Sequence, residues 1–356
     1  MRNYKLYIIP LFVLSLAFLY SEKNDGLRNI LLTPEFNFKD TSVHNRYGDL
    51  YRLCKVDNFR EGMYYAEKPE PKLSPDSADI FIIGDSYFER PVDGEFLSSD
   101  LEKLFNFKIY DLSVLNGRAA DFPVEAIKNL NYNKEKNKIL LLETTERLSY
   151  SRALNSYPGS RGGAFPDYNG IKDLLYRTFL YRQFLVEHSR IALPVVQFKN
   201  TLNFNLFRVM DRNIGAYSME PPMLFYVQDV EFANHTEMPG DADKTAEKIE
   251  ELNTLLKQNY NITLLYIVIP DKYSIYNDYV TGGYKYSGFI PGLVKRLNEK
   301  NIYTIDLYTL FMKHKQQSPG ELLYYKSDSH FNRTGKNIFL EEVGKKIREM
   351  KLKIGG

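Results

Sequence analysis

The amino-acid sequence predicts an α/β fold with a mostly parallel sheet. Two observations predict it. Short apolar stretches of strand length alternate along the chain with longer stretches whose apolar residues recur at helical spacing, as in βαβ units. The strand stretches, such as 138–144 (KILLLET) and 261–270 (NITLLYIVIP), are almost continuously apolar, which indicates strands buried on both faces.

The N-terminus predicts export. Arg2 and Lys5 accompany an apolar stretch at 6–20, and polar residues follow, which is the layout of a secretory signal or an N-terminal anchor. The stretch is shorter than the roughly 20 residues of a comfortable span. It also lacks a clear small-x-small cleavage site, which favours an uncleaved anchor. We therefore expect residues 1–21 to be a signal peptide or membrane anchor, and the rest to lie in the periplasm or on the outer face of the cytoplasmic membrane. The alternative is a buried N-terminal helix.

Residues 22–78 form an irregular lead-in that ends in a proline-rich stretch, and the main domain is expected at 79–356. Its first half predicts three strands and two helices, in the order strand 79–86, helix 93–106, strand 107–114, a helix within 122–137 and strand 138–144.

Residues 151–220 interrupt this alternation, and we expect a helical insertion or cap over the sheet there. The alternation then resumes with strand 223–232, helix 241–260, strand 261–270, helix 288–301, a strand and short helix at 302–311, and a last helix at 332–351.

Bulk composition excludes several functions. The 356 residues carry a net charge of +2, so no strong positive field attracts nucleic acid. Cys54 is the single cysteine, which excludes an intramolecular disulfide and a cysteine-based zinc site. Any histidine chemistry must use one of five side chains, which are His44, His188, His235, His314 and His330. No cofactor is expected.

Polar groups follow the first strand of the predicted sheet. Gly84-Asp85-Ser86 stands where a serine hydroxyl would face the cleft at the carboxyl edge of a parallel sheet, with a helix N-terminus beside it. One interpretation is that Ser86 is a nucleophile. The other is a plain turn, since glycine, aspartate and serine end strands well.

A second polar group precedes the last helix. A serine nucleophile needs a base, and an imidazole base needs a carboxylate partner; Asp328 and His330 supply both from one loop. The alternative is a solvated loop in which Asp328 caps the helix. A metal site is not expected, because no second histidine or acidic cluster stands at ligand spacing.

Two further groups are candidates. Asn116-Gly117-Arg118 follows the second strand, where backbone N–H groups and the arginine would serve an oxyanion, or form only a turn. Glu143, Glu146 and Arg147 follow the third strand, and a buried Glu/Arg pair there would be a structural brace rather than a catalytic group.

These motifs resemble the SGNH/GDSL hydrolase superfamily, which has a three-layer, flavodoxin-like α/β/α sandwich and a Ser-His-Asp triad. The Asp-x-His spacing, the block 266–276 (YIVIPDKYSIY) with Lys272, and the blocks ETTERLSY and YYKSDSHFNRTG are similar to the alginate O-acetyltransferase family, of AlgJ and AlgX type. The similarity covers roughly 78–350 without 151–220. Two features differ from the alginate enzymes: the serine block comes first, and Phe331 replaces a tryptophan.

The resemblance implies that Ser86 is the nucleophile, His330 the base and Asp328 its partner. It places Gly117, Arg118, Asp85 and Lys272 in oxyanion or substrate binding. The expected activity is transfer of acetyl to a polysaccharide hydroxyl through an acetyl-serine, with a membrane-bound O-acyltransferase as a candidate acetyl source. An SGNH carbohydrate esterase and a non-catalytic glycan-binding component of an export complex remain the alternatives.

Overall fold

The computed structural model describes residues 44–65, 73–115, 119–155, 189, 192–234, 239–283 and 285–355. At its centre lies a five-stranded sheet in the order β4-β3-β5-β8-β9, in which every neighbouring pair is parallel. Its strands are β3 (Ile80–Ile83), β4 (Ile109–Asp111), β5 (Lys138–Thr145), β8 (Ile262–Ile269) and β9 (Tyr303–Ile305). In chain order this is the arrangement of a doubly wound, flavodoxin-like sheet. The α/β fold predicted from the sequence is confirmed.

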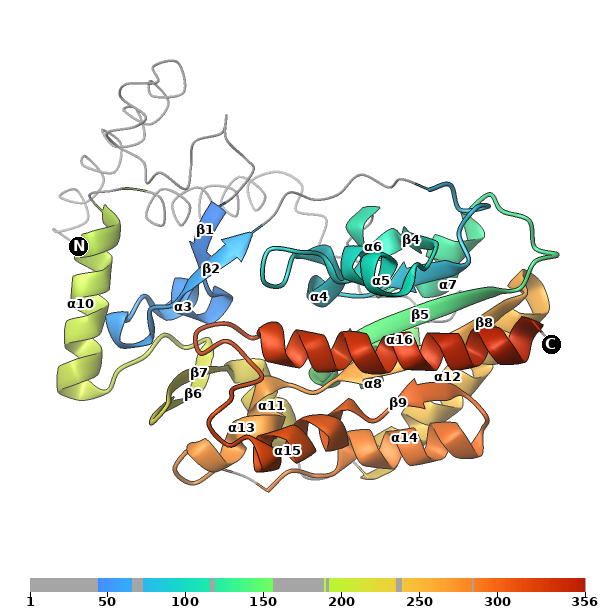
Figure 1. Cartoon of the computed structure of the whole chain (residues 1–356). Coiled ribbons are helices and arrows are strands. Elements are labelled where there is room, and N and C mark those ends of the chain that lie inside the picture. The colour runs from blue at the N-terminus through green and yellow to red at the C-terminus, as the bar shows by residue number, and fades with distance from the viewer. Residues whose placement is uncertain are drawn as a thin grey trace, which may run out of the picture.

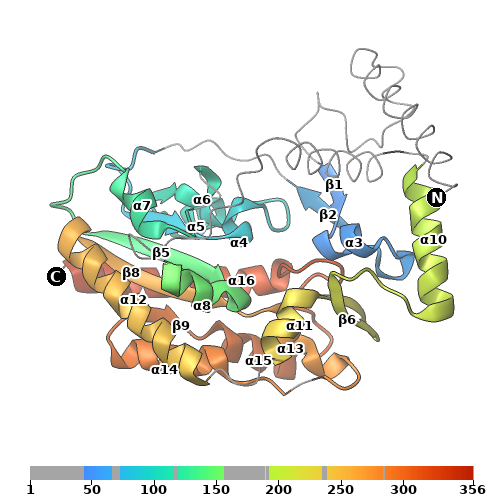
Figure 2. The ribbon, with the colours of Figure 1, turned by 180° about the vertical axis from the view of Figure 1, so that it is seen from behind.

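Helices cover both faces of the sheet, as Figures 1 and 2 show for α16 and α12 on opposite sides. Ile80 and Ile82 of β3 contribute to one apolar core, and Phe81 and Ile83 to the other. This alternation follows from the opposite directions of successive side chains in a strand. The first core includes α5 (Leu97–Phe105), α15 (Leu307–Gln317) and α16 (Arg333–Gly355); the second includes α7 (Pro123–Lys128), α12 (Pro239–Tyr260) and α14 (Phe289–Glu299).

Short helices begin where the central strands end. The helix α4 (Ser86–Glu89) follows β3, α6 (Leu112–Leu115) follows β4, α8 (Glu146–Asn155) follows β5, and α13 (Lys272–Tyr276) follows β8, with a 3-10 turn η3 (Asn277–Tyr279) after it. All four strand ends lie at one edge because the strands are parallel. The switch point between β3 and β5 therefore gathers side chains from distant parts of the chain.

A smaller unit packs near this edge. The hairpin strands β1 (His44–Tyr47) and β2 (Gly62–Tyr65) enclose α3 (Asp49–Cys54) and the 3-10 turn η2 (Asp57–Phe59), and α10 (Ala192–Phe207) and the hairpin β6 (Ile214–Met219) and β7 (Pro222–Tyr226) lie beside them. Leu50, Phe59, Phe204 and Leu224 share a small core of their own. In Figure 1 these elements lie together at the end of the molecule opposite the C-terminus.

One predicted strand is wrong in extent and in place. Residues 223–232 were expected as a strand of the resumed βα alternation, but the strand stops at Tyr226, and α11 (Val227–Asn234) takes the rest. The strand β7 pairs antiparallel with β6 and lies outside the central sheet. Leu224 is apolar because it fills the small core rather than the central one.

Two other expectations fall partly or wholly outside the described residues. Of the insertion expected at 151–220, the described part contains the end of α8, then α10 and β6, while 156–188 lies outside it. The signal or anchor expected at 1–21 also lies outside it. Within the described part of the chain, no helix combines the length and apolar character needed to cross a bilayer.

Candidate active site

The turn after β3 is shaped by contacts that require a glycine. The amide of Gly84 donates to Ser113 Oγ at 2.7 Å, and the amide of Asp85 donates to Glu143 Oε2 at 2.9 Å. A Cβ at Gly84 would lie 2.6 Å from Glu143 Oε2 and 2.6 Å from the Phe88 ring. The chain therefore passes close over β5 and presents Ser86 as the first residue of α4, half-buried at the sheet edge.

Ser86, His330 and Asp328 form a continuous hydrogen-bonded chain, although Ser86 and His330 are 244 residues apart. Ser86 Oγ lies 2.8 Å from His330 Nε2, and His330 Nδ1 lies 2.6 Å from Asp328 Oδ1. With its proton on Nδ1, the imidazole donates to Asp328 and accepts from the Ser86 hydroxyl through Nε2. This is the geometry of a nucleophile, a base and an orienting carboxylate.

The pKa values of Asp328 and His330 suit an orienting carboxylate and a base. Burial alone raises the pKa of Asp328, but the His330 charge and hydrogen bonds from His330 and the Asp49 amide outweigh it and lower the pKa to about 2. Burial lowers the pKa of His330, but the charges of Asp328 and Asp49 and the Asp328 hydrogen bond outweigh burial and raise it above its ordinary value. Asp328 therefore stays ionised beside the imidazole near neutral pH.

The alternative interpretation of Asp328 as a solvated cap of the last helix is wrong. Its side chain is 1% exposed, and Oδ1 also accepts from the His330 amide at 2.9 Å. The residue at the start of α16 that accepts from the helix is Asn332, whose Oδ1 takes hydrogen bonds from Thr334 N at 2.9 Å and Gly335 N at 3.3 Å.

Lys272 lies beneath the loop that carries Asp328. Its Nζ donates to the carbonyl oxygens of Lys326 at 2.8 Å and Asp328 at 3.1 Å, and its side chain is fully buried. Burial lowers the pKa of Lys272 to about 7. We had expected Lys272 in oxyanion or substrate binding; the structure places its amine on the backbone of the triad loop.

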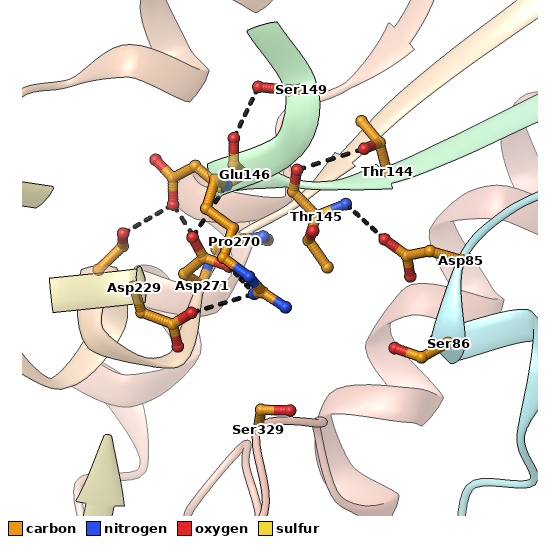
Figure 3. A network of polar contacts seen from close by, with 12 residues as sticks. Asp85, Ser86, Thr144, Thr145, Glu146, Ser149, Asp229, Pro270, Asp271 and Ser329 are labelled. Carbon is orange, nitrogen blue, oxygen red and sulfur yellow. Dashed lines mark hydrogen bonds and ion pairs between the residues drawn. The ribbon is translucent and has the colours of Figure 1, made fainter. Parts of the chain in front are cut away.

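Asp85 also faces the interior. Its Oδ2 accepts from Thr145 N at 3.0 Å and from Arg152 at 2.8 Å, and Figure 3 shows Asp85 reaching toward Thr145 beside Ser86. Arginine contact outweighs burial and lowers the pKa of Asp85. The other two residues expected to serve an oxyanion, Gly117 and Arg118, lie outside the described residues.

Arg147 forms a buried brace, but its partners are two aspartates rather than the expected glutamate. Arg147 contacts Asp271 at 2.7 Å and Asp229 at 3.0 Å, and both carboxylates are buried. Glu146 instead accepts from Ser274 Oγ at 2.6 Å and from Asp271 N at 3.1 Å. Figure 3 shows Glu146, Asp229 and Asp271 grouped on one side of the site. Two aspartates share one guanidinium here, so the brace ties together the start of α8, α11 and the residue that precedes α13.

The sequence did not identify two acidic residues of the site, Asp49 and Glu61. The amide of Asp49 donates to Asp328 Oδ2 at 2.7 Å, and Glu61 Oε2 accepts from Ser327 N at 3.1 Å. Because Asp49 approaches Asp328 and His330, potential ligand atoms of these three lie within 4.8 Å of one another. The sequence shows no acidic cluster at metal-ligand spacing, but the fold brings Asp49 close to Asp328 and His330. Hydrogen bonds already join Asp328 to the Asp49 amide and to the His330 imidazole.

A pocket opens beside the nucleophile. Its volume is about 330 Å³. The side chains around it combine the Ser86–His330 pair with three arginines and residues of α3; they are Asp49, Leu50, Arg52, Leu53, Ser86, Arg90, Arg147, Tyr226, Ser329 and His330. Ser86 thus has open space beside its hydroxyl.

A comparison with protein families supports the resemblance seen in the sequence. Residues 223–355 match the family ALGX, described as the SGNH hydrolase-like domain of the acetyltransferase AlgX. The match includes Lys272, Asp328 and His330, and Ser86 lies outside it. Searches of curated proteins and of solved structures found no match. The SGNH-like, AlgX-type resemblance is confirmed for this C-terminal part.

Proposed function

We propose that this protein is an exported serine-dependent O-acetyltransferase, which moves acetyl groups to hydroxyls of a cell-surface or secreted polysaccharide through an acetyl-serine. The observation that supports it most is the chain from Ser86 to His330 to Asp328, at 2.8 and 2.6 Å. The match of 223–355 to an acetyltransferase family favours transfer over hydrolysis. Export rests on the basic and apolar pattern of residues 1–21.

The proposed reaction has two symmetrical halves. Ser86 Oγ attacks the acetyl carbonyl of the donor while His330 Nε2 takes its proton, and the imidazolium then gives that proton to the departing donor group. In the second half the polysaccharide hydroxyl gives its proton to His330 and attacks the acetyl-serine, and Ser86 leaves with the proton that His330 returns. Asp328 stabilises the imidazolium in both halves. A membrane-bound O-acyltransferase is the proposed acetyl source.

The test uses the purified full-length chain with p-nitrophenyl acetate as donor and a panel of glycan oligomers as acceptors. Released nitrophenol reports donor cleavage, and mass spectrometry locates acetyl on Ser86 and on each oligomer. Acetylated oligomer that depends on Ser86 supports the transferase. Free acetate without acetylated sugar would indicate the esterase, and no acyl-serine at all would indicate a glycan-binding component.

Ser86→Ala and His330→Ala are each expected to lower acyl turnover by about 1000-fold or more while the fold stays intact, because either change removes a member of the triad. Asp328→Asn should be milder than His330→Ala. The matched control is Ser151→Ala, which alters an exposed serine of α8. Near wild-type turnover in either alanine variant would show that the triad is assigned wrongly.

A further inference from the structure

The segment between β1 and β2 reaches the loop that carries Asp328 and His330, although the sequence separates it from the main domain. Ser327 O accepts from Tyr51 N at 3.0 Å, and Ser327 N donates to Glu61 at 3.1 Å. Gly48 packs against the Ser327 carbonyl so closely that a Cβ would overlap it. The loop is therefore held from the side of α3 as well as from below by Lys272.

Asp49 makes the most direct of these contacts. Its amide donates at 2.7 Å to Asp328 Oδ2, the oxygen that does not bind the imidazole. Its carboxylate accepts from Ser329 N at 2.8 Å and from Ser329 Oγ at 2.5 Å. Asp49 thus binds the residues on both sides of the Asp328–Ser329 peptide bond and fixes how Asp328 faces His330.

The carboxyl group of Asp49 also lies near the imidazole. Burial and the charge of Asp328 raise its pKa, and the charge of His330 and the hydrogen bonds from Ser329 oppose that rise. Asp49 Oδ2 is 3.8 Å from His330 Nδ1, the nitrogen that already faces Asp328 Oδ1 at 2.6 Å. Other groups near His330 are the Ser329 hydroxyl at 3.4 Å from Nδ1, the Tyr87 ring at 4.6 Å between centroids, the Ser86 hydroxyl and the opposing charge of Arg90. Charges at this separation interact more strongly when partly shielded from water than in bulk solvent.

We propose that Asp49 is a positioning residue of this active site, which orients Asp328 and Ser329 through hydrogen bonds and stabilises the imidazolium form of His330 by its negative charge. The proposal rests on the acyl-transfer function of Ser86 and His330. The raised pKa of His330, to which the Asp49 charge contributes, is consistent with it. The lead-in segment is thereby a part of the catalytic unit.

The test replaces Asp49 by Asn in the full-length chain. An asparagine oxygen can still accept from Ser329 N, and the backbone amide on Asp328 is retained. The change removes the charge and the second oxygen, which accepts from Ser329 Oγ. We expect kcat/KM for p-nitrophenyl acetate to fall about tenfold on the alkaline plateau, as when an outer residue that orients an imidazole is lost. Because His330 acts as base only when neutral, the acid limb of the profile should move to lower pH.

The control is Asp57→Asn, which removes the same charge from an exposed position of the same segment. It should leave unchanged both the alkaline plateau of kcat/KM and the pH of the acid limb. A lower plateau in Asp49→Asn with an unmoved limb would mean that Asp49 has only a structural role and would overturn the electrostatic proposal. An unchanged plateau and limb would overturn the proposal entirely.

A second measurement separates this proposal from the proposed function. The imidazole resonances of His330 are titrated by NMR in the Ser86→Ala background, with and without Asp49→Asn. The proposal requires a lower pKa of His330 in the double variant, whatever reaction the protein performs. An equal pKa in both would refute the proposal even if acetyl transfer by the wild type is established; a lower pKa without acetyl transfer would refute only the function.

Discussion

Two carboxyl groups meet beneath the turn that presents Ser86, and their surroundings move their pKa values in opposite directions. Arg152 and the amide of Thr145 contact Asp85, so its pKa is lowered despite burial. Burial and the charge of Asp85 raise the pKa of Glu143 well above its ordinary value. Glu143 Oε1 is buried without a hydrogen-bond partner among the described residues. A neutral Glu143 beside an ionised Asp85 is the arrangement that these contacts favour.

Gly84→Ala tests how tightly this turn is packed. Its Cβ would meet Glu143 Oε2 and the Phe88 ring at 2.6 Å, and both neighbours are fully buried. We expect the free energy of unfolding to fall by about 1–3 kcal/mol, the usual cost of overpacking a core, with reduced acyl turnover because Ser86 shifts. Urea denaturation measures the first effect.

Gly320→Ala is the matched control, because a Cβ there meets nothing within 4 Å. It should change the free energy of unfolding by less than about 0.5 kcal/mol. Equal stability of the two variants would show that the turn relaxes around the added methyl group.

The juxtaposition of Ser86, Asp328 and His330 could be predicted because each stands beside a strand end or helix start that is visible in the sequence. Asp49 and Glu61 could not, because no strand end or motif marks them, and their partners 279 and 266 residues away are visible only in the fold. Locally, Asp49 looks like any acidic residue in the first turn of a helix. Only the packing of α3 on the triad loop gives it a second role.

At the scale of elements, the contact between the start of α3 and residues 326–330 decides the shape of the site. Gly48 is the close point of that contact, and its φ of −52° and ψ of 151° suit any residue. An alanine there would cause no backbone strain, so its effect must come from the overlap with Ser327.

Gly48→Ala should therefore displace the loop and reduce kcat/KM by about 100-fold, the order of loss that follows a displacement of about 1 Å in a catalytic group. Gly320→Ala again serves as control. The measurement is kcat/KM with p-nitrophenyl acetate, alongside circular dichroism to show that the fold is retained. Wild-type kcat/KM in Gly48→Ala would mean that α3 does not position the loop.

Elements buried on both faces were the easiest to predict from the sequence. The strands β5 and β8 are buried at every residue, so their runs of apolar residues identify them directly. The prediction at 223–232 failed although the segment is buried, because β7 packs Met223 and Phe225 into the first core and Leu224 into the small core without joining the central sheet. Periodicity reports burial, and it does not report which core a segment enters.

At the scale of the whole molecule, the parallel sheet brings the two halves of the chain to one edge. Lys272 is the first residue of α13, just after β8. Its side chain is fully buried at this edge of the sheet. A neutral amine has two N–H groups, and two carbonyls, those of Lys326 and Asp328, accept from Nζ. Burial favours the neutral form and lowers the pKa of Lys272 to about 7, although nearby carboxylates such as Asp328 oppose it.

This predicts an unusual pH dependence of stability. The unfolded chain holds the Lys272 proton up to its ordinary pKa of 10.5, whereas the folded chain releases it at about 7. Between these values the unfolded state binds more protons, so the free energy of unfolding should rise with pH by up to about 1.4 kcal/mol per pH unit. His330, whose pKa is raised, contributes the opposite trend as the pH passes through its folded pKa.

Lys272→Met separates the two contributions, because it removes only the lysine. Urea unfolding at pH 7.5 and 9 should show a gain in stability for the wild type that is absent in Lys272→Met. The variant should also be less stable at pH 9 by about 1–3 kcal/mol, because two buried carbonyls lose their donor. Lys257→Met, at an exposed position of α12, is the control and should keep the wild-type gain. An equal gain in all three proteins would mean that Lys272 is charged in the folded state, and that the triad loop rests on a buried ammonium group.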